Sequence, residues 1–94
     1  MKITATMTEK LQKIDVSKNL LDNIDALNQL TRLKVIIASE NYIRSANLQL
    51  PKLQELDLRN NSIEKVPILS QMPQLKVLIL NANKITELKL QCKD

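Results

Sequence analysis

A repeated spacing of leucines and asparagines constrains the fold of this chain more than any other feature. When the chain is compared with itself, four segments align on an asparagine, and each follows L-x-x-L-x-L-x-x-N-x-L with aliphatic or alanine substitutions. The segments are LQKIDVSKNLL from Leu11, LKVIIASENYI from Leu33, LQELDLRNNSI from Leu53 and LKVLILNANKI from Leu75. Such self-similarity is typical of a protein made of stacked repeats. We therefore expect many thin layers rather than one central core.

The centre of each segment predicts a short strand. In L-x-L the two apolar side chains point to the same side, and strands of successive repeats are expected to pair in parallel. The inward pairs are then Ile14 and Val16, Ile36 and Ala38, Leu56 and Leu58, Leu78 and Leu80. Where the chain turns off each strand, buried backbone groups need partners, and an asparagine amide both donates and accepts. We expect a ladder made of Asn19, Asn41, Asn61 and Asn83.

The return segments between the strands have two different periods. Apolar residues recur at every third position from Ile24 to Leu33 and from Val66 to Leu75. This spacing favours 3₁₀ turns. The other returns have a period of two, which favours an extended segment. Their apolar residues are Ala46, Leu48 and Leu50 in one copy and Leu88, Leu90 and Cys92 in the other.

The aligned motifs, which cover the chain from Leu11 to Cys92, resemble the leucine-rich-repeat family. The 22-residue members are similar to the class found in the leucine-rich regulatory subunit of protein phosphatase 1 and in several cytoskeletal and ciliary proteins. The resemblance implies an α/β-type leucine-rich-repeat right-handed solenoid. Its short parallel strands would line the concave face, and its 3₁₀ and extended segments would form the convex face.

A longer unit is visible within the repeats. The intervals between the asparagines are 22, 20 and 22, and residues 10–51 align without a gap on residues 52–93 with fifteen identities in 42 positions. We expect an N-terminal cap or lead-in at residues 1–10 and leucine-rich repeats at residues 11–94, the last one truncated. In this register Cys92 takes the place of Leu50 and is expected to pack as a small apolar residue. A longer chain or a second copy would then complete the uncapped C-terminal end.

Several classes of function lack candidate residues. Without histidine, and with one cysteine assigned to packing, neither nucleophilic nor general acid–base catalysis has a group to use, and no metal site can be assembled. The absence of glycine removes phosphate-binding loops. We therefore predict no enzyme activity and no cofactor. A lone cysteine and no signal-peptide pattern favour a cytoplasmic location, with nuclear or cytoskeletal and ciliary locations as alternatives.

The charge of +4 does not by itself indicate nucleic-acid binding. Each half of the chain carries seven basic and five acidic residues, and only one residue, Tyr42, is aromatic. Base stacking and a clustered basic patch are therefore both missing. Some spliceosomal proteins nevertheless use leucine-rich repeats of a similar class, and an RNA-associated scaffold stays an alternative.

The strand residues between the inward leucines define the candidate site. They form three rows across the repeats, and the second and fourth strands offer valine and isoleucine where the first and third offer charges. One interpretation is that these residues only favour strand formation. The other is a protein-binding surface, because apolar residues rimmed by charges are typical of one. The predicted contacts are Val35, Ile37, Glu55, Asp57, Arg59, Val77, Ile79 and Asn81.

The sequence thus predicts a protein–protein interaction or scaffolding module whose partner is another protein. A phosphatase-regulatory subunit and an architectural cytoskeletal or ciliary subunit are the alternatives within the same fold. No small-molecule substrate and no membrane are expected.

Overall fold

The computed structural model of the chain describes residues 3–85. One helix precedes four strands, and a 3₁₀ helix lies in the first and in the third return. In chain order the elements are α1 (Ala5–Lys10), β1 (Lys13–Asp15), η1 (Asp25–Gln29), β2 (Val35–Ile37), β3 (Glu55–Asp57), η2 (Leu69–Gln71) and β4 (Val77–Ile79).

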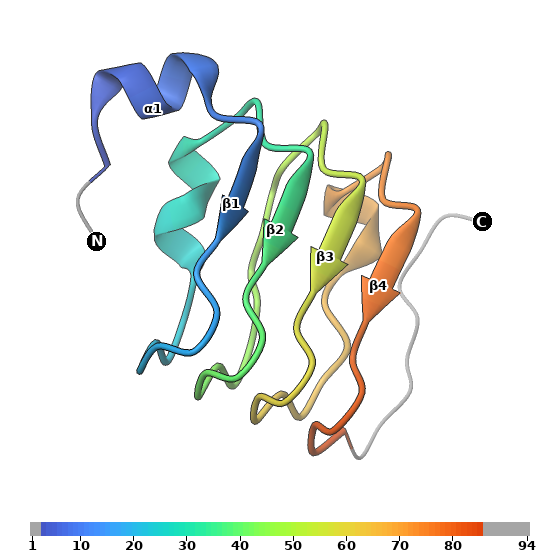
Figure 1. Cartoon of the computed structure of the whole chain (residues 1–94). Coiled ribbons are helices and arrows are strands. Elements are labelled where there is room, and N and C mark those ends of the chain that lie inside the picture. The colour runs from blue at the N-terminus through green and yellow to red at the C-terminus, as the bar shows by residue number, and fades with distance from the viewer. Residues whose placement is uncertain (1–2, 86–94) are drawn as a thin grey trace.

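The four strands form one parallel sheet in the order β1-β2-β3-β4, as predicted (Figure 1). The inward residues are in register, since Ile14 pairs with Ile36, Ile36 with Leu56, and Leu56 with Leu78. Each of the strands β1, β2 and β3 is followed by a turn and a return segment, so that consecutive strands become neighbours in the sheet. One repeat of the sequence is therefore one layer of the structure.

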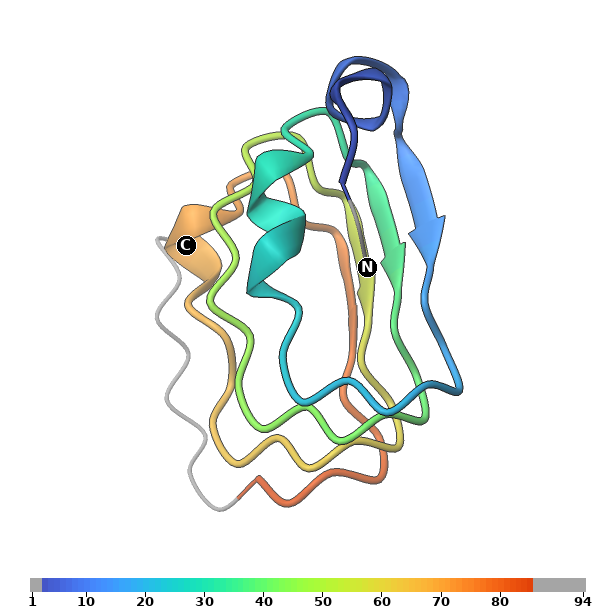
Figure 2. The same cartoon turned by 90° about the vertical axis from the view of Figure 1, so that its left-hand side faces the viewer.

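The return segments lie on the side of the layers opposite the sheet (Figure 2). Both predicted 3₁₀ segments are confirmed as η1 and η2. The second return has no helix, and Ala46, Leu48 and Leu50 are buried along it, as the period of two predicted. Leu88, Leu90 and Cys92, on which the corresponding prediction for the fourth return rests, lie outside the described residues.

Aliphatic side chains fill the space between the sheet and the returns. Twelve large apolar side chains are fully buried, and they come from every layer up to η2. They are Leu27, Leu30, Leu33, Ile36, Ile43, Leu48, Leu50, Leu53, Leu56, Leu58, Ile63 and Met72. Each such burial stabilises the fold by roughly 1.5 to 3 kcal/mol relative to an exposed side chain. The layers therefore cohere without any buried aromatic ring among residues 3–85.

The asparagine ladder is confirmed in detail. The amide nitrogen of Asn41 donates to the carbonyls of Val16, Ala38 and Ser39 at 3.1, 3.2 and 3.1 Å. Its oxygen accepts from the backbone N–H groups of Asn19 and Leu21. One buried side chain thus satisfies five backbone groups of two adjacent turns.

Asn61 and Asn83 repeat this arrangement. Asn61 accepts from the N–H of Ile43 and donates to three carbonyls, and Asn83 accepts from the N–H of Ile63. Asn19, which no described repeat precedes, is exposed and donates only to the carbonyls of Val16 and Ser17. Burial of the amide therefore depends on having a repeat on each side.

The residue before each ladder asparagine has a left-handed backbone. The φ angles are 58°, 56°, 57° and 57° at Lys18, Glu40, Asn60 and Ala82. This conformation is unfavourable for residues with a Cβ, and glycine or asparagine usually occupies it. Only Asn60 is of a favoured type, so the tertiary bonds around the turn must hold the other three in place.

The N-terminal segment forms a short helix. Thr4 caps α1, because its hydroxyl accepts from the N–H of Met7 at 3.2 Å. Ile3 and Met7 are partly buried against the core, whereas Ala5 is exposed. The helix lies beside β1, at the end of the sheet opposite β4 (Figure 1).

Candidate functional site: the exposed face of the sheet

Two of the predicted rows are in register across all four strands. The first row places Lys13, Val35, Glu55 and Val77 side by side. The second row places Asp15, Ile37, Asp57 and Ile79 side by side. The alternation of charged and apolar residues along the chain thus becomes an alternation of strands on one face.

The third row follows the ends of the strands. The N–H of Lys18 donates to the carbonyl of Ser39, that of Glu40 to Arg59 and that of Asn60 to Asn81. These bonds hold Ser17, Ser39, Arg59 and Asn81 in neighbouring turns. The Ser39 hydroxyl donates to the Ser17 hydroxyl oxygen at 3.0 Å. All eight predicted contact residues are therefore brought together on β2, β3, β4 and the turns that follow them.

The apolar members of the rows are accessible. Val77 is 40% exposed, and Val35, Ile37 and Ile79 are half-buried by their strand neighbours. Since one face of the sheet packs on the core, this second face presents apolar surface to solvent.

Asp57 differs from the expectation for a contact residue. It is only 5% exposed, although it stands on the solvent side of the sheet between Ile37 and Ile79. Its carboxylate accepts from Nη2 of Arg59 at 2.6 Å and from Nε at 3.1 Å. Hydrogen bonding to Asp57 and the negative charge of that carboxylate raise the pKa of Arg59 above its ordinary value. Asp57 therefore positions Arg59, whose side chain is 52% exposed.

Asp15 shares this backbone geometry without the arginine. Its carboxylate accepts from the N–H of Ser17 at 3.0 Å, as that of Asp57 does from the N–H of Arg59 at 3.2 Å. The backbone and side-chain hydrogen bonds from Ser17 lower the pKa of Asp15 below its usual range.

Two exposed apolar side chains outside the sheet face were not found by the sequence reasoning. Leu20 is 84% exposed and Tyr42 is 60% exposed. The N–H of Tyr42 donates to the carbonyl of Leu21, so the two side chains belong to adjacent turns. Both residues follow a ladder asparagine, a position that the repeat pattern leaves free. This shared position, directly after a ladder asparagine, is the signal that could have revealed these two exposed side chains.

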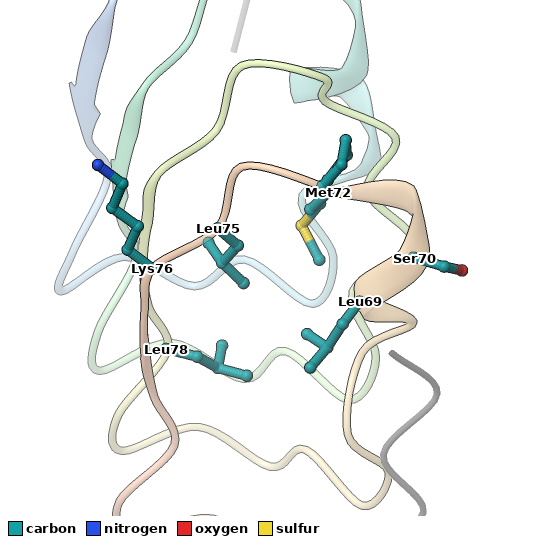
Figure 3. Close-up of a pocket in the computed structure, with 7 residues that line it drawn as sticks. Leu69, Ser70, Met72, Leu75, Lys76 and Leu78 are labelled. Carbon is teal, nitrogen blue, oxygen red and sulfur yellow. The ribbon is translucent and has the colours of Figure 1, made fainter. Parts of the chain in front are cut away.

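A pocket of about 510 Å³ lies at the β4 end of the sheet, between β4 and η2. Its lining is mainly apolar and comes from Leu69, Ser70, Met72, Pro73, Leu75, Lys76 and Leu78. The side chains of Leu69, Met72, Leu75 and Leu78 point toward one another across it (Figure 3). The sequence reasoning named an unfinished last layer but no cavity.

Other kinds of site have no counterpart in the part of the chain that the structure describes. Among residues 3–85 there is no group of three or more His, Cys, Asp or Glu side chains that could hold a metal ion. No helix in the same residues has the length and apolar character needed to cross a membrane.

The parallel register, the asparagine ladder and the returns on one side of the sheet define a repeat protein of stacked strand-and-return layers. Residues 51–92 match the family model described as Leucine Rich repeats (2 copies). This match covers less than half of the chain, and it confirms the predicted resemblance to the leucine-rich-repeat family over these residues. The narrower resemblance to the regulatory subunit of protein phosphatase 1 stays a prediction. No curated protein and no solved structure significantly matches the chain.

Proposed function

We propose that the chain is a protein–protein interaction or scaffolding module that binds a partner through the exposed face of its sheet. Leucine-rich-repeat domains generally mediate protein–protein interaction and are typically non-enzymatic. The proposal includes a curved right-handed solenoid with this face on its concave side, residues 1–10 as its N-terminal lead-in, and a cytoplasmic location.

The observation that carries the proposal is the registered alternation of apolar and charged strands. Val35 and Val77 flank Glu55, and Ile37 and Ile79 flank Asp57. At about 4.8 Å per strand, the apolar residues of β2 and β4 are roughly 9 to 10 Å apart. A partner can therefore place apolar side chains on both strands while a polar group reaches the strand between them.

The charges of β3 and of the turn that follows it give this surface its selectivity. Glu55 is exposed and accepts a basic group, while Arg59 offers a cationic group that Asp57 already orients. A guanidinium fixed in this way loses little side-chain entropy when a carboxylate binds. The fitting partner surface has apolar residues beside one basic and one acidic side chain.

The other functions that the sequence left open receive less support. The rows on β1 to β4 contain no aromatic side chain, so an RNA-associated scaffold lacks a stacking surface on this face. A phosphatase-regulatory and a cytoskeletal or ciliary role are both compatible with the same binding face, and the identity of the partner separates them.

The test uses two apolar-to-lysine variants with the same starting exposure. Val77 on the sheet face is 40% exposed, and Ile68 beside η2 on the return side is 39% exposed. A photoreactive residue is placed at Lys13, which is exposed in the first row of the same face. Proteins that become cross-linked to it are identified by mass spectrometry, and each candidate is then titrated as a pure protein.

If the face binds, Val77→Lys weakens the titrated complex by at least about tenfold, or about 1.4 kcal/mol, and the double variant Ile37→Lys plus Ile79→Lys abolishes it. Ile68→Lys leaves the affinity within about twofold of the wild type. An equal loss for Val77→Lys and Ile68→Lys would contradict the proposed face. So would full binding by the double variant.

A further inference from the structure

The chain enters each strand through a short segment with the same pattern. Residues 10–12, 32–34, 52–54 and 74–76 read KLQ, RLK, KLQ and QLK, so that a leucine lies between two polar residues each time. Leu33 and Leu53 are 0% exposed. Leu11 and Leu75 are half-buried. The leucines thus belong to the core, whereas the polar residues on either side of them are exposed, apart from the half-buried Gln54.

The last three of these segments begin in equivalent turns. In each turn the N–H of the leucine donates to a carbonyl three residues earlier at 3.0 to 3.3 Å, and the pairs are Leu33 with Leu30, Leu53 with Leu50 and Leu75 with Met72. Arg32, Lys52 and Gln74 therefore occupy the same corner of successive turns. Lys10, the last residue of α1, directly precedes the first leucine of the series.

Backbone hydrogen bonds hold the residues after the leucines in line. The N–H of Lys34 donates to the carbonyl of Gln12 at 2.7 Å. The N–H of Gln54 donates to the carbonyl of Lys34, and that of Lys76 to the carbonyl of Gln54, both at 2.8 Å. At about 4.8 Å per strand, the four segments span roughly 14 Å. They form one edge of the molecule, where the strands begin (Figure 1).

Positive charge is concentrated along this edge. The four segments contain no acidic residue and five basic ones, here called the basic edge: Lys10, Arg32, Lys34, Lys52 and Lys76. The rest of residues 3–85 carries six basic and eight acidic residues. The ion pair found among residues 3–85 joins Arg59 to Asp57 and uses none of the basic edge. The side chain of Lys76 extends away from Leu75 and Leu78 (Figure 3).

Counting charges by halves of the chain predicted no clustered basic patch. The residues of the basic edge are far apart in the sequence, and only the stacking of the layers brings them together. The structure therefore adds a charged surface that is separate from the sheet face.

The surroundings of the basic edge favour one kind of anionic ligand. A membrane surface needs apolar side chains that insert into it. The exposed large apolar residues of the described chain all lie outside the four segments, and they are Leu20, Tyr42, Ile68 and Val77. A single-stranded nucleic acid needs aromatic side chains for base stacking, and the four segments contain none. Glu9 and Glu55 border the basic edge, so a phosphate backbone that continued past it would meet negative charge. A short acidic protein segment requires only the complementary charge.

We propose that the basic edge binds an acidic segment of a partner protein, about four or five residues long, that runs across the layers. At about 3.3 Å per residue, an extended segment of this length covers the roughly 14 Å of the edge. Its carboxylates pair with the lysine ammonium groups and with the guanidinium of Arg32. The amides of Gln12 and Gln74 donate to the remaining carboxylate oxygens.

The first experiment titrates the full chain into a fluorescein-labelled peptide of consecutive glutamates flanked by serines, and measures anisotropy at low ionic strength. Two double variants remove the same net charge from exposed positions. Arg32→Gln plus Lys52→Gln changes the basic edge, and Arg44→Gln plus Lys84→Gln changes two residues that follow ladder asparagines. The first variant should weaken binding by at least about tenfold, or about 1.4 kcal/mol, and the second by less than about twofold. Equal losses would show that only the net charge of the chain attracts the peptide, and would overturn the proposal.

Amide NMR of the wild-type chain locates the peptide without any substitution. Chemical-shift changes on titration should be largest at residues 10–12, 32–34 and 52–54. Largest changes along the rows of the sheet face would refute the assignment to the basic edge and leave the proposed face to its own test. No binding at peptide concentrations up to about 1 mM, or about 4.1 kcal/mol, would also overturn the proposal.

Salt and other polyanions separate this site from alternative ligands. Raising the ionic strength from about 0.01 M to about 0.1 M shortens the Debye length from roughly 30 Å to roughly 10 Å, so the peptide should bind several-fold more weakly. An affinity that does not change with salt would contradict binding through exposed charges. Oligouridylate or anionic lipid vesicles that bind more tightly than the peptide, and lose affinity in Arg32→Gln plus Lys52→Gln, would assign the basic edge to nucleic acid or to a membrane instead.

Discussion

The asparagine ladder makes a quantitative prediction through Asn41→Asp. The substitution keeps the size of the side chain and its bonds from the N–H groups of Asn19 and Leu21. It removes both amide protons, which Asn41 donates to three carbonyls at 3.1 to 3.2 Å, and sets an oxygen against those carbonyls. Asn41 is 6% exposed, so water cannot readily replace the lost bonds.

The expected loss follows from these bonds. A net value of about 1 kcal/mol for each of three bonds gives a loss of roughly 3 kcal/mol in the free energy of unfolding at pH 7. Asn19→Asp is the control. Asn19 is exposed and donates to two carbonyls, so the expected loss there is below about 1 kcal/mol. Urea unfolding followed by circular dichroism gives both values.

The loss should also depend on pH in a defined direction. Burial and the facing carbonyls raise the pKa of the new carboxyl above that of an aspartic acid in the unfolded chain. Below the unfolded pKa both states are protonated, and the difference between variant and wild type is smallest. The difference grows as pH rises toward the folded pKa and is constant above it. Equal losses for Asn41→Asp and Asn19→Asp, or a loss for Asn41→Asp that is larger at pH 4 than at pH 7, would refute the reasoning.

Three further predictions follow from other contacts. Lys18→Asn should raise the free energy of unfolding by about 0.5 to 1 kcal/mol, and Asn60→Lys should lower it by a similar amount. Both residues have φ near 57°, and asparagine tolerates this conformation better than lysine does. Urea titration of the two variants checks that the changes have opposite signs. Ser17→Ala should move the pKa of Asp15 up toward its ordinary value, which NMR of the carboxyl carbon can follow. Because the folded pKa of Asp15 is lowered, any stabilising contribution of this carboxylate is present above the unfolded pKa. That contribution is lost as pH falls through the folded pKa. Leu27→Ala should cost about 2 to 5 kcal/mol, since Leu27 is 1% exposed, whereas Leu20→Ala at an 84% exposed site should cost under about 0.5 kcal/mol; a similar cost at both sites would contradict the assigned core.

Much of the fold could be predicted because the same physical requirement recurs in every repeat. The alternating pair Ile36 and Ala38 predicts an inward-facing strand, and the asparagine three residues after it predicts a polar group that serves the turn. Repetition at a fixed offset distinguishes these residues from chance, and the observed register and ladder confirm them. The same argument correctly predicted η1 and η2 from a period of three.

Features without a repeated signal could not be predicted. The burial of Asp57 depends on how Arg59 folds back over it and on the neighbouring Ile37 and Ile79, which no single strand reveals. The left-handed residues Lys18 and Glu40 were not anticipated, because glycine, the usual marker of that conformation, is absent from the chain. The bonds to the next layer, rather than local preference, select their conformation.

The backbone hydrogen bonds between neighbouring layers determine the order in which the layers unfold. Each strand of the described sheet is held mainly by the strands on either side of it, so β2 and β3 are supported on two sides and β4 on one. In a linear array of this kind, fraying begins at the less protected terminus and each inner layer opens only after its outer neighbour. The rate of native-state amide hydrogen exchange should therefore differ from layer to layer, with the amides of Ile36 and Leu56 the last to exchange. The stability of each layer thus depends on the layers that are its neighbours.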